Sequence, residues 1–90
     1  MGYEYMLDFE VVERGDADRV LRSVAGFEGF DPKFGLYYFR RTATGAMPDA
    51  QAAIENAGIY VCDNGVAYQV VRDIQAAFAA IGLRAEPREL

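Results

Sequence analysis

Apolar and polar side chains alternate along the first twelve residues of the chain. Tyr3, Leu7 and Val11 occupy odd positions, whereas acids such as Glu4 and Asp8 occupy even ones. A period of two over this length is typical of a strand with one buried face and one wet face. The pattern predicts a strand of an antiparallel sheet, because a fully buried parallel strand would not carry several acids on one face.

The following segment changes to helical spacing. Its apolar stripe consists of Ala17, Val20, Leu21 and Val24. This spacing predicts an amphipathic helix over about 17–25. Asp16 is a suitable N-cap, and Gly26 is a natural stop. Asp18 and Arg22 can form an ion pair at i, i+4.

A second helical pattern lies in the last third of the chain. Its apolar positions are Val66, Val70, Ile74, Ala77, Phe78 and Ile81. They predict a helix over 66–81, capped by Asp63 or Asn64 and ended by Gly82. The Asn-Gly pair before it is also a hairpin signal, so a strand over 66–71 stays open as an alternative.

The remaining segments are shorter. Residues 27–35 hold two glycines and a proline and are predicted to be a loop. Strands are predicted over 36–41, 58–63 and 83–90. Pro87 restricts the last of these to an edge of the sheet, because proline cannot donate to the hydrogen-bond ladder.

Residues 48–57 fit two structures. Pro48 suits a first helical position, and the alanines that follow favour a short helix, which is the preferred prediction. The alternative is a hairpin in which 51–55 pairs with 59–63.

The order of these elements predicts a single α+β domain of the ferredoxin-like, split β-α-β type. In this sandwich two helices pack on one face of an antiparallel sheet. The first and last strands would be neighbours, so the outward Glu4, Asp8 and Glu10 would face the outward Arg84 and Arg88.

The composition excludes some classes of partner. A chain with 52% hydrophobic and 26% charged residues is typical of one soluble domain. The formal charge of −5 argues against binding nucleic acid or an anionic membrane surface. The N-terminus lacks a signal-peptide pattern, no segment is long enough to span a membrane, and a single cysteine forms no internal disulfide. These features predict a cytoplasmic protein.

Cys62 is the only cysteine of the chain. A nucleophilic cysteine needs a base or a positive charge nearby, but the chain has no histidine, and the neighbour of the thiol is Asp63. We therefore interpret Cys62 as a small apolar strand residue. With Ile59 and Val61 pointing inward, it would share the open sheet face with Tyr60.

The chain offers no other recognised chemistry. Its acids at positions 4, 8 and 10 form a wet face, and no phosphate-binding loop or metal-ligand motif is present. We predict no catalytic residue, no cofactor and no metal, and favour a protein that is not an enzyme.

Half of the twelve aromatic residues lie within 27–39. A strand cannot bury three consecutive aromatic residues on one face, so at least one of positions 37, 38 and 39 points to the open side. This cluster, together with nearby arginines and the open-face residues of 58–63, predicts an interface or ligand patch. Its members are Phe27, Phe30, Phe34, Tyr38, Arg40, Arg41, Tyr60 and Cys62.

Three functions fit these observations. The first is a non-catalytic interaction module that contacts a protein partner or a second copy through its open sheet face. The second is a small-molecule sensor with an aromatic pocket near Phe27, Phe30 and Phe34, anchored by Arg40 or Arg41. The third is an acidic inhibitor of a basic protein.

Overall fold

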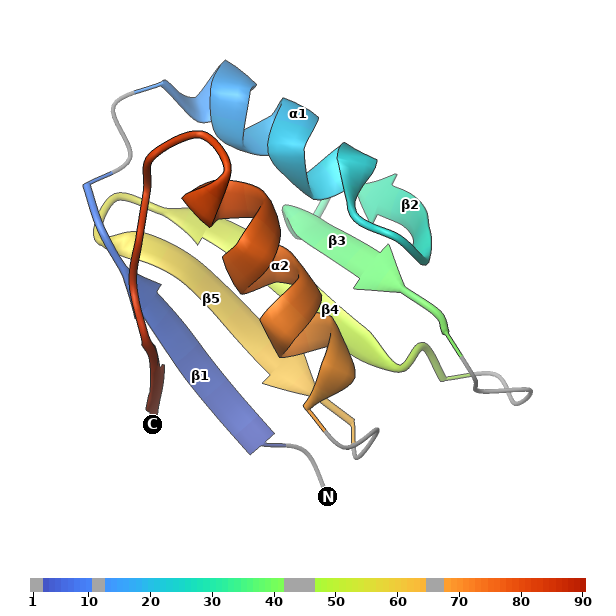
Figure 1. Cartoon of the computed structure of the whole chain (residues 1–90). Helices are drawn as coiled ribbons and strands as arrows, with labels where there is room; N and C mark the ends of the chain where they lie inside the picture. Colours follow the sequence, from blue (N-terminus) through green and yellow to red (C-terminus); the bar gives the residue numbers. More distant parts are fainter. Residues whose placement is uncertain (1–2, 11–12, 42–46, 65–67) are drawn as a thin grey trace.

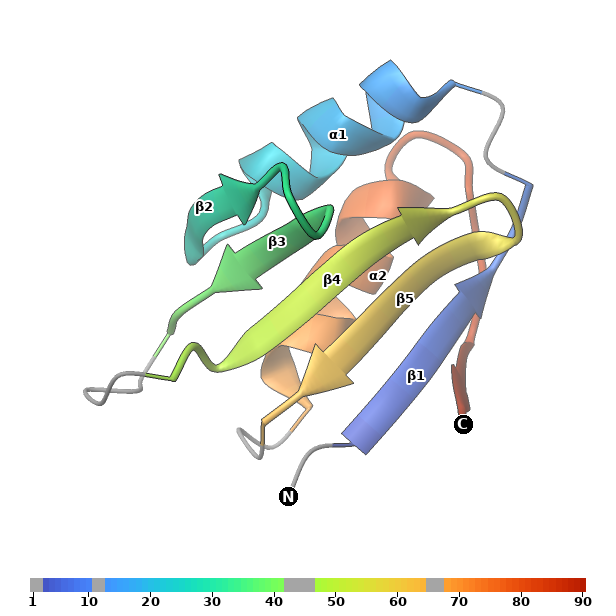
Figure 2. The ribbon, with the colours of Figure 1, turned by 180° about the vertical axis from the view of Figure 1, so that it is seen from behind.

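The strands of this protein form one antiparallel sheet that carries two helices on one face (Figures 1 and 2). The computed structural model describes residues 3–10, 13–41, 47–64 and 68–90. The elements in these residues are β1 (Tyr3–Asp8), α1 (Arg14–Ser23), β2 (Phe27–Asp31), β3 (Leu36–Phe39), β4 (Ala50–Glu55), β5 (Gly58–Asp63), α2 (Gln69–Ala79) and β6 (Pro87–Glu89). The strand order across the sheet is β2-β3-β4-β5-β1-β6.

The predicted α+β class, with an antiparallel sheet and two helices, is confirmed. The ferredoxin-like arrangement is not, because the sheet has six strands in a different order. β1 and β6 are neighbours, as expected, and Arg88 of β6 binds Asp8 of β1 through two hydrogen bonds of 2.8 and 2.9 Å. The predicted charge match across the first and last strands is therefore confirmed for this pair.

The helix preferred for residues 48–57 is wrong, and the alternative hairpin is correct. Ala50 and Ala52 lie fully buried on β4 under the helices, and Ala52 pairs with Val61 of β5. β4 also pairs with β3 on its other side. Local alanine propensity favours a helix only weakly, whereas pairing on both sides buries these residues and satisfies the strand backbone.

The loop expected over 27–35 is also wrong for its first part. Phe27–Asp31 forms β2, an edge strand, and only residues 32–35 form the turn into β3. The register shifts between Phe27 and Gly29, where the strand is irregular. Such a bulge breaks the period-two pattern, which is why the sequence does not show the strand. β3 ends at residue 39, two residues earlier than predicted.

Helix α1 begins three residues earlier than predicted. Its N-cap residue is Glu13, and Asp16 lies in the first turn, where its carboxylate binds Arg19. The predicted pair of Asp18 and Arg22 is present, at 3.0 Å. The predicted apolar stripe faces the sheet, with three of its members buried: Ala17, Leu21 and Val24.

Helix α2 covers residues 69–79 of the predicted range 66–81, of which 66 and 67 lie outside the described residues. Residues 69–71 are helical, so the strand alternative is wrong for them. The N-cap is Tyr68, in a left-handed conformation, and not Asp63 or Asn64. Asp63 still supports the start of the helix, because its carboxylate accepts a hydrogen bond from the Tyr68 backbone N–H at 3.0 Å.

The end of the chain forms a shorter strand than predicted. The strand β6 covers Pro87–Glu89, and it lies at the edge of the sheet beside β1, as the proline requires. Leu83 and Ala85, predicted to point inward, pack against the core.

The core lies between the sheet and the two helices. The largest side chains that are fully buried there are Leu7, Leu21, Phe39, Ile59, Ile74 and Phe78. β5 supplies this core from the centre of the sheet, since it pairs with β1 on one side and β4 on the other.

Gly58 marks the tightest backbone approach in the sheet. A Cβ atom built there would lie 1.8 Å from the carbonyl oxygen of Leu7, and its φ of 144° is one that other residues rarely adopt. The turn before it is held against the end of β1 by a 3.1 Å hydrogen bond from the Phe9 N–H to the Ala57 carbonyl. Only glycine therefore fits where β5 begins beside β1.

We expect Gly58→Ala to lower the free energy of unfolding by about 2 kcal/mol or more, because the new methyl group collides with backbone that cannot move away cheaply. Gly15→Ala in α1 is the matched control. Its Cβ would meet nothing within 4 Å, so the better helix former should raise stability by about 0.5–1 kcal/mol. Urea unfolding followed by circular dichroism measures both. Equal effects of the two substitutions would contradict the tight approach at Gly58.

Candidate functional site

The sheet face opposite the helices is not covered by any element that the structure describes (Figure 2). The register places the alternate side chains of five strands on it. Its apolar members, which we call the open-face cluster, are Met6, Leu36, Tyr38, Ala53, Tyr60 and Cys62. Met6 is only 8% exposed and the others are partly buried. Tyr60 pairs across the strands with both Met6 and Ala53, and Gln51 lies between Tyr38 and Cys62.

Polar contacts surround this cluster. The Tyr60 hydroxyl donates to a Glu4 carboxylate oxygen at 2.5 Å. Burial is the main cause, and this hydrogen bond the second cause, that raises the pKa of the Tyr60 phenol well above its ordinary value. The phenol therefore stays a neutral donor. Asp8 is paired with Arg88 in the adjoining strand, and this contact lowers the pKa of Asp8. The acids predicted to form a wet face are thus partly engaged in contacts within the chain.

Cys62 lies on this face beside Tyr60, with Ile59 and Val61 fully buried on the other side, as the strand pattern predicts. The thiol is free and partly buried. Its sulfur lies 3.9 Å from the Asn64 side-chain oxygen, a weak contact at most. No group of three or more metal-ligating side chains occurs within the described residues. The geometry around the thiol is that of a packed strand residue.

Other members of the predicted patch lie on the helix side of the sheet. Phe27 and Phe30 face the same side as Tyr37, with the Phe30 and Tyr37 ring centroids 4.5 Å apart. The Arg22 guanidinium of α1 lies over these rings, 5.4 Å from the Phe30 centroid and 5.6 Å from that of Phe27. These aromatic residues therefore attach the β2–β3 hairpin to α1.

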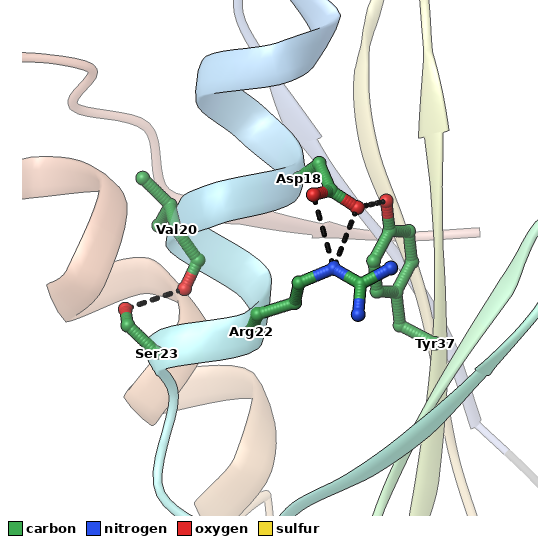
Figure 3. A network of polar contacts seen from close by, with 5 residues as sticks. All are labelled: Asp18, Val20, Arg22, Ser23 and Tyr37. Atoms are coloured by element: carbon green, nitrogen blue, oxygen red, sulfur yellow. Dashed lines mark hydrogen bonds and ion pairs between the residues drawn. The ribbon is translucent and has the colours of Figure 1, made fainter.

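A polar network joins the same two elements (Figure 3). The Arg22 Nε donates to both carboxylate oxygens of Asp18 at 3.0 Å, and the Tyr37 hydroxyl donates to Asp18 at 2.5 Å. The hydrogen bond from Tyr37, with a smaller contribution from Arg22, holds the pKa of Asp18 below its ordinary value. Burial raises the pKa of Tyr37 far above its ordinary range. The sequence indicated the pair on the helix but not the tyrosine, which is nineteen residues away.

The last three predicted patch residues lie at the periphery. Phe34 is 65% exposed in the β2–β3 turn, with the Lys33 ammonium 5.3 Å from its ring centroid. Arg40 binds Glu28 at 2.5 Å, and Arg41 binds Asp73 of α2 at 2.8 Å. The predicted patch is therefore dispersed: Phe27 and Phe30 lie on the helix side, Tyr38, Tyr60 and Cys62 share the open face, and Phe34 lies in the β2–β3 turn.

Two cavities flank the first turn of α1, and the sequence predicted neither of them in this form. One of about 210 Å³ is lined by Phe9, Glu10, Glu13, Asp16, Ala17, Ile81 and Leu83. The other, of about 280 Å³, is lined by Arg14, Gly15, Phe30, Gly35, Tyr37 and Ile54. The carboxylates of the first turn thus border one cavity and its arginine borders the other.

Comparison with family models, curated proteins and solved structures finds no match to this chain. Neither helix in the described residues is long and apolar enough to cross a membrane. The functional argument therefore rests on the geometry of the chain itself.

We expect Asp18→Asn to lower the free energy of unfolding at neutral pH by about 1 kcal/mol, because it weakens the charge-assisted hydrogen bonds to Tyr37 and Arg22. Since the native contacts hold the pKa of Asp18 below its ordinary 3.8, the stabilisation is complete above that value and lost as the pH falls through the lower native value. The difference between the wild type and the variant should therefore shrink in acid.

Urea unfolding between neutral pH and strong acid measures this difference. Asp16→Asn on the same helix is the control, because the exposed pair of Asp16 with Arg19 should contribute little. Identical pH profiles for the two variants would show that Tyr37 does not strengthen the Asp18 contact.

Proposed function

We propose that the protein is a non-catalytic interaction module that forms a homodimer by packing the open faces of two sheets together. One observation carries this proposal: the apolar centre formed by the open-face cluster lies on a sheet face that no described helix covers. Antiparallel sheets with one solvated face normally show polar side chains there. Here the face carries aromatic, aliphatic and thiol side chains, with Gln51 between Tyr38 and Cys62. The apolar side chains gain free energy when a second apolar face excludes water.

The dimensions of the chain suit such a contact. Its Cα atoms extend over 35 × 25 × 21 Å, and the sheet spreads over the broad sides of this shape. A standard interface takes about 800 Å² from each partner, which a sheet of this breadth can supply. Two sheets pack about 10 Å apart when their side chains interdigitate, as in a sandwich.

The charges around the face support a second copy as the occupant. Because each chain has a net charge of −5, two copies repel each other electrostatically as they approach. Around this face, however, Asp8 is paired with Arg88 and Glu4 accepts a hydrogen bond from Tyr60. These contacts reduce the repulsion that two copies would meet at close range.

The edges of the sheet are poorer contact sites. β6 has three residues and begins with Pro87, and β2 carries a register shift after Phe27. Short strands, prolines and bulges are the features that block strand addition at an edge. We therefore expect two copies of the chain to associate through their sheet faces and not by strand addition at an edge.

We also infer that the strands β4, β5, β1 and β6 form a ferredoxin-like core to which β2 and β3 are added. These four strands lie side by side in the order β4-β5-β1-β6, and α2 connects β5 to β6, which supports this inference. The added β2–β3 hairpin extends the open face, because β3 contributes Leu36 and Tyr38 to it. The larger face supports a contact with a second copy.

Sedimentation equilibrium tests the proposal. We expect the 10.0 kDa chain to approach twice that mass as its concentration rises from low micromolar towards millimolar. Tyr38→Arg should weaken dimer formation by about tenfold or more, because it introduces an unpaired charge into the apolar centre. Phe34→Arg is the matched control, because Phe34 lies in the β2–β3 turn and should not affect association.

A monomer at every concentration would contradict the homodimer. Equal weakening by both variants would show that another surface is used. A monomer that instead binds basic proteins, and loses this binding in high salt, would favour the acidic inhibitor.

A further inference from the structure

The cavity of about 280 Å³ is lined by α1 and by Tyr37, which points to the helix side of the sheet, opposite to the open-face cluster. The first turn of α1 forms one wall with Arg14 and Gly15. The β2–β3 hairpin forms the opposite wall with Phe30, Gly35 and Tyr37, and Ile54 of β4 completes the lining. Its volume is close to the lower end of small-molecule pockets, so it suits a ligand with a single ring.

Two glycines are part of the lining of this cavity. A Cβ atom built on Gly15 or on Gly35 would meet nothing within 4 Å. Gly35 has a φ of 67°, so the turn itself favours glycine there. Gly15 has no such requirement, and in a helix it is less favourable than alanine. A larger side chain at Gly15 therefore has room at the wall of the cavity.

Arg14 supplies the polar group of the cavity. Its Nη2 donates to the Ile54 carbonyl at 2.9 Å, which holds the guanidinium at the rim. Five other arginines each pair with a carboxylate: Arg19, Arg22, Arg40, Arg41 and Arg88. In the ranges that the structure describes, Arg14 has no such ion pair. A guanidinium has five N–H donors, so most remain available to an anion.

The remaining walls are aromatic. The rings of Phe30 and Tyr37 are tilted by 42° with centroids 4.5 Å apart. The Tyr37 hydroxyl is already bound to Asp18, and Asp18 also binds Arg22. The carboxylate that Tyr37 contacts is thus engaged by two donors, and the aromatic side of the cavity offers apolar surface.

We propose that this cavity binds a small aromatic carboxylic acid, with the carboxylate on the Arg14 guanidinium and the ring against Phe30 and Tyr37. A carboxylate matches the planar donors of arginine, and an aromatic ring matches the apolar walls. This site differs from the sequence prediction, in which Arg40 or Arg41 anchored the ligand, because both of those arginines are paired elsewhere. It does not depend on the proposed homodimer.

Three nearly isosteric probes test the proposal: benzoate, benzamide and benzamidine, which differ mainly in charge. In a ¹H–¹⁵N correlation titration of the full chain, benzoate should shift the amide signals of Gly15 and Gly35 and reach saturation. Benzamide should bind about tenfold more weakly, because it lacks the charge-assisted contact. Benzamidine, a cation, should leave these two signals unchanged.

Two variants complete the test. Arg14→Gln should weaken benzoate binding by about tenfold or more, whereas Arg84→Gln, a change at an exposed arginine outside the cavity, should not affect it. Gly15→Leu should fill the cavity and abolish binding, with the rest of the spectrum retained.

Equal binding of benzoate and benzamide, or unchanged affinity in Arg14→Gln, would overturn the assignment of Arg14. Shifts caused by benzamidine at Ala17 and Leu83 alone would place ligand binding in the acid-lined cavity, and would overturn the proposal as a whole.

Discussion

The alternation of side chains along β5, Gly58–Asp63, is the constraint on which the rest of the structure depends. This strand pairs with β1 and β4, so its backbone groups are satisfied on both sides. Ile59 and Val61 are fully buried under the helices, and Tyr60 and Cys62 must then point the other way. Both the core and the open face follow from this one strand. A shift of one residue in its register would exchange them.

The two helices cover only one of these faces. The aromatic residues of β2 and β3 are therefore divided between a covered face and an uncovered one. The hairpin of β2 and β3 presents Phe27, Phe30 and Tyr37 to α1, where Arg22 and Asp18 join them. Tyr38 points to the uncovered side. The same hairpin therefore contributes to two different surfaces. One is an apolar sheet face suited to a second copy, and the other is a cavity suited to a small ligand.

Much of the fold could be predicted where the pattern is local. The strand 58–63, the stripe of α1 and the pair of Asp18 with Arg22 all follow from periods of two or of three to four residues. The wrong predictions concern segments whose secondary structure depends on contacts with residues distant in the sequence. The alanines of β4 favour a helix until pairing with β3 and β5 is considered, and β2 is hidden by its bulge and by Gly29. The sequence predicts an aromatic pocket near Phe30 but not this lining, because the cavity joins three segments that no spacing rule connects.

Cys62 allows the most direct test of the central claim, that the open face is covered by a second copy of the chain. Its thiol lies on that face and is the only one in the sequence. A short pulse of iodoacetamide, followed by intact mass measurement, gives its alkylation rate at each protein concentration. The account predicts that the rate falls as the dimer forms, and stays constant in Tyr38→Arg. A wild-type rate that is the same at every concentration would contradict it.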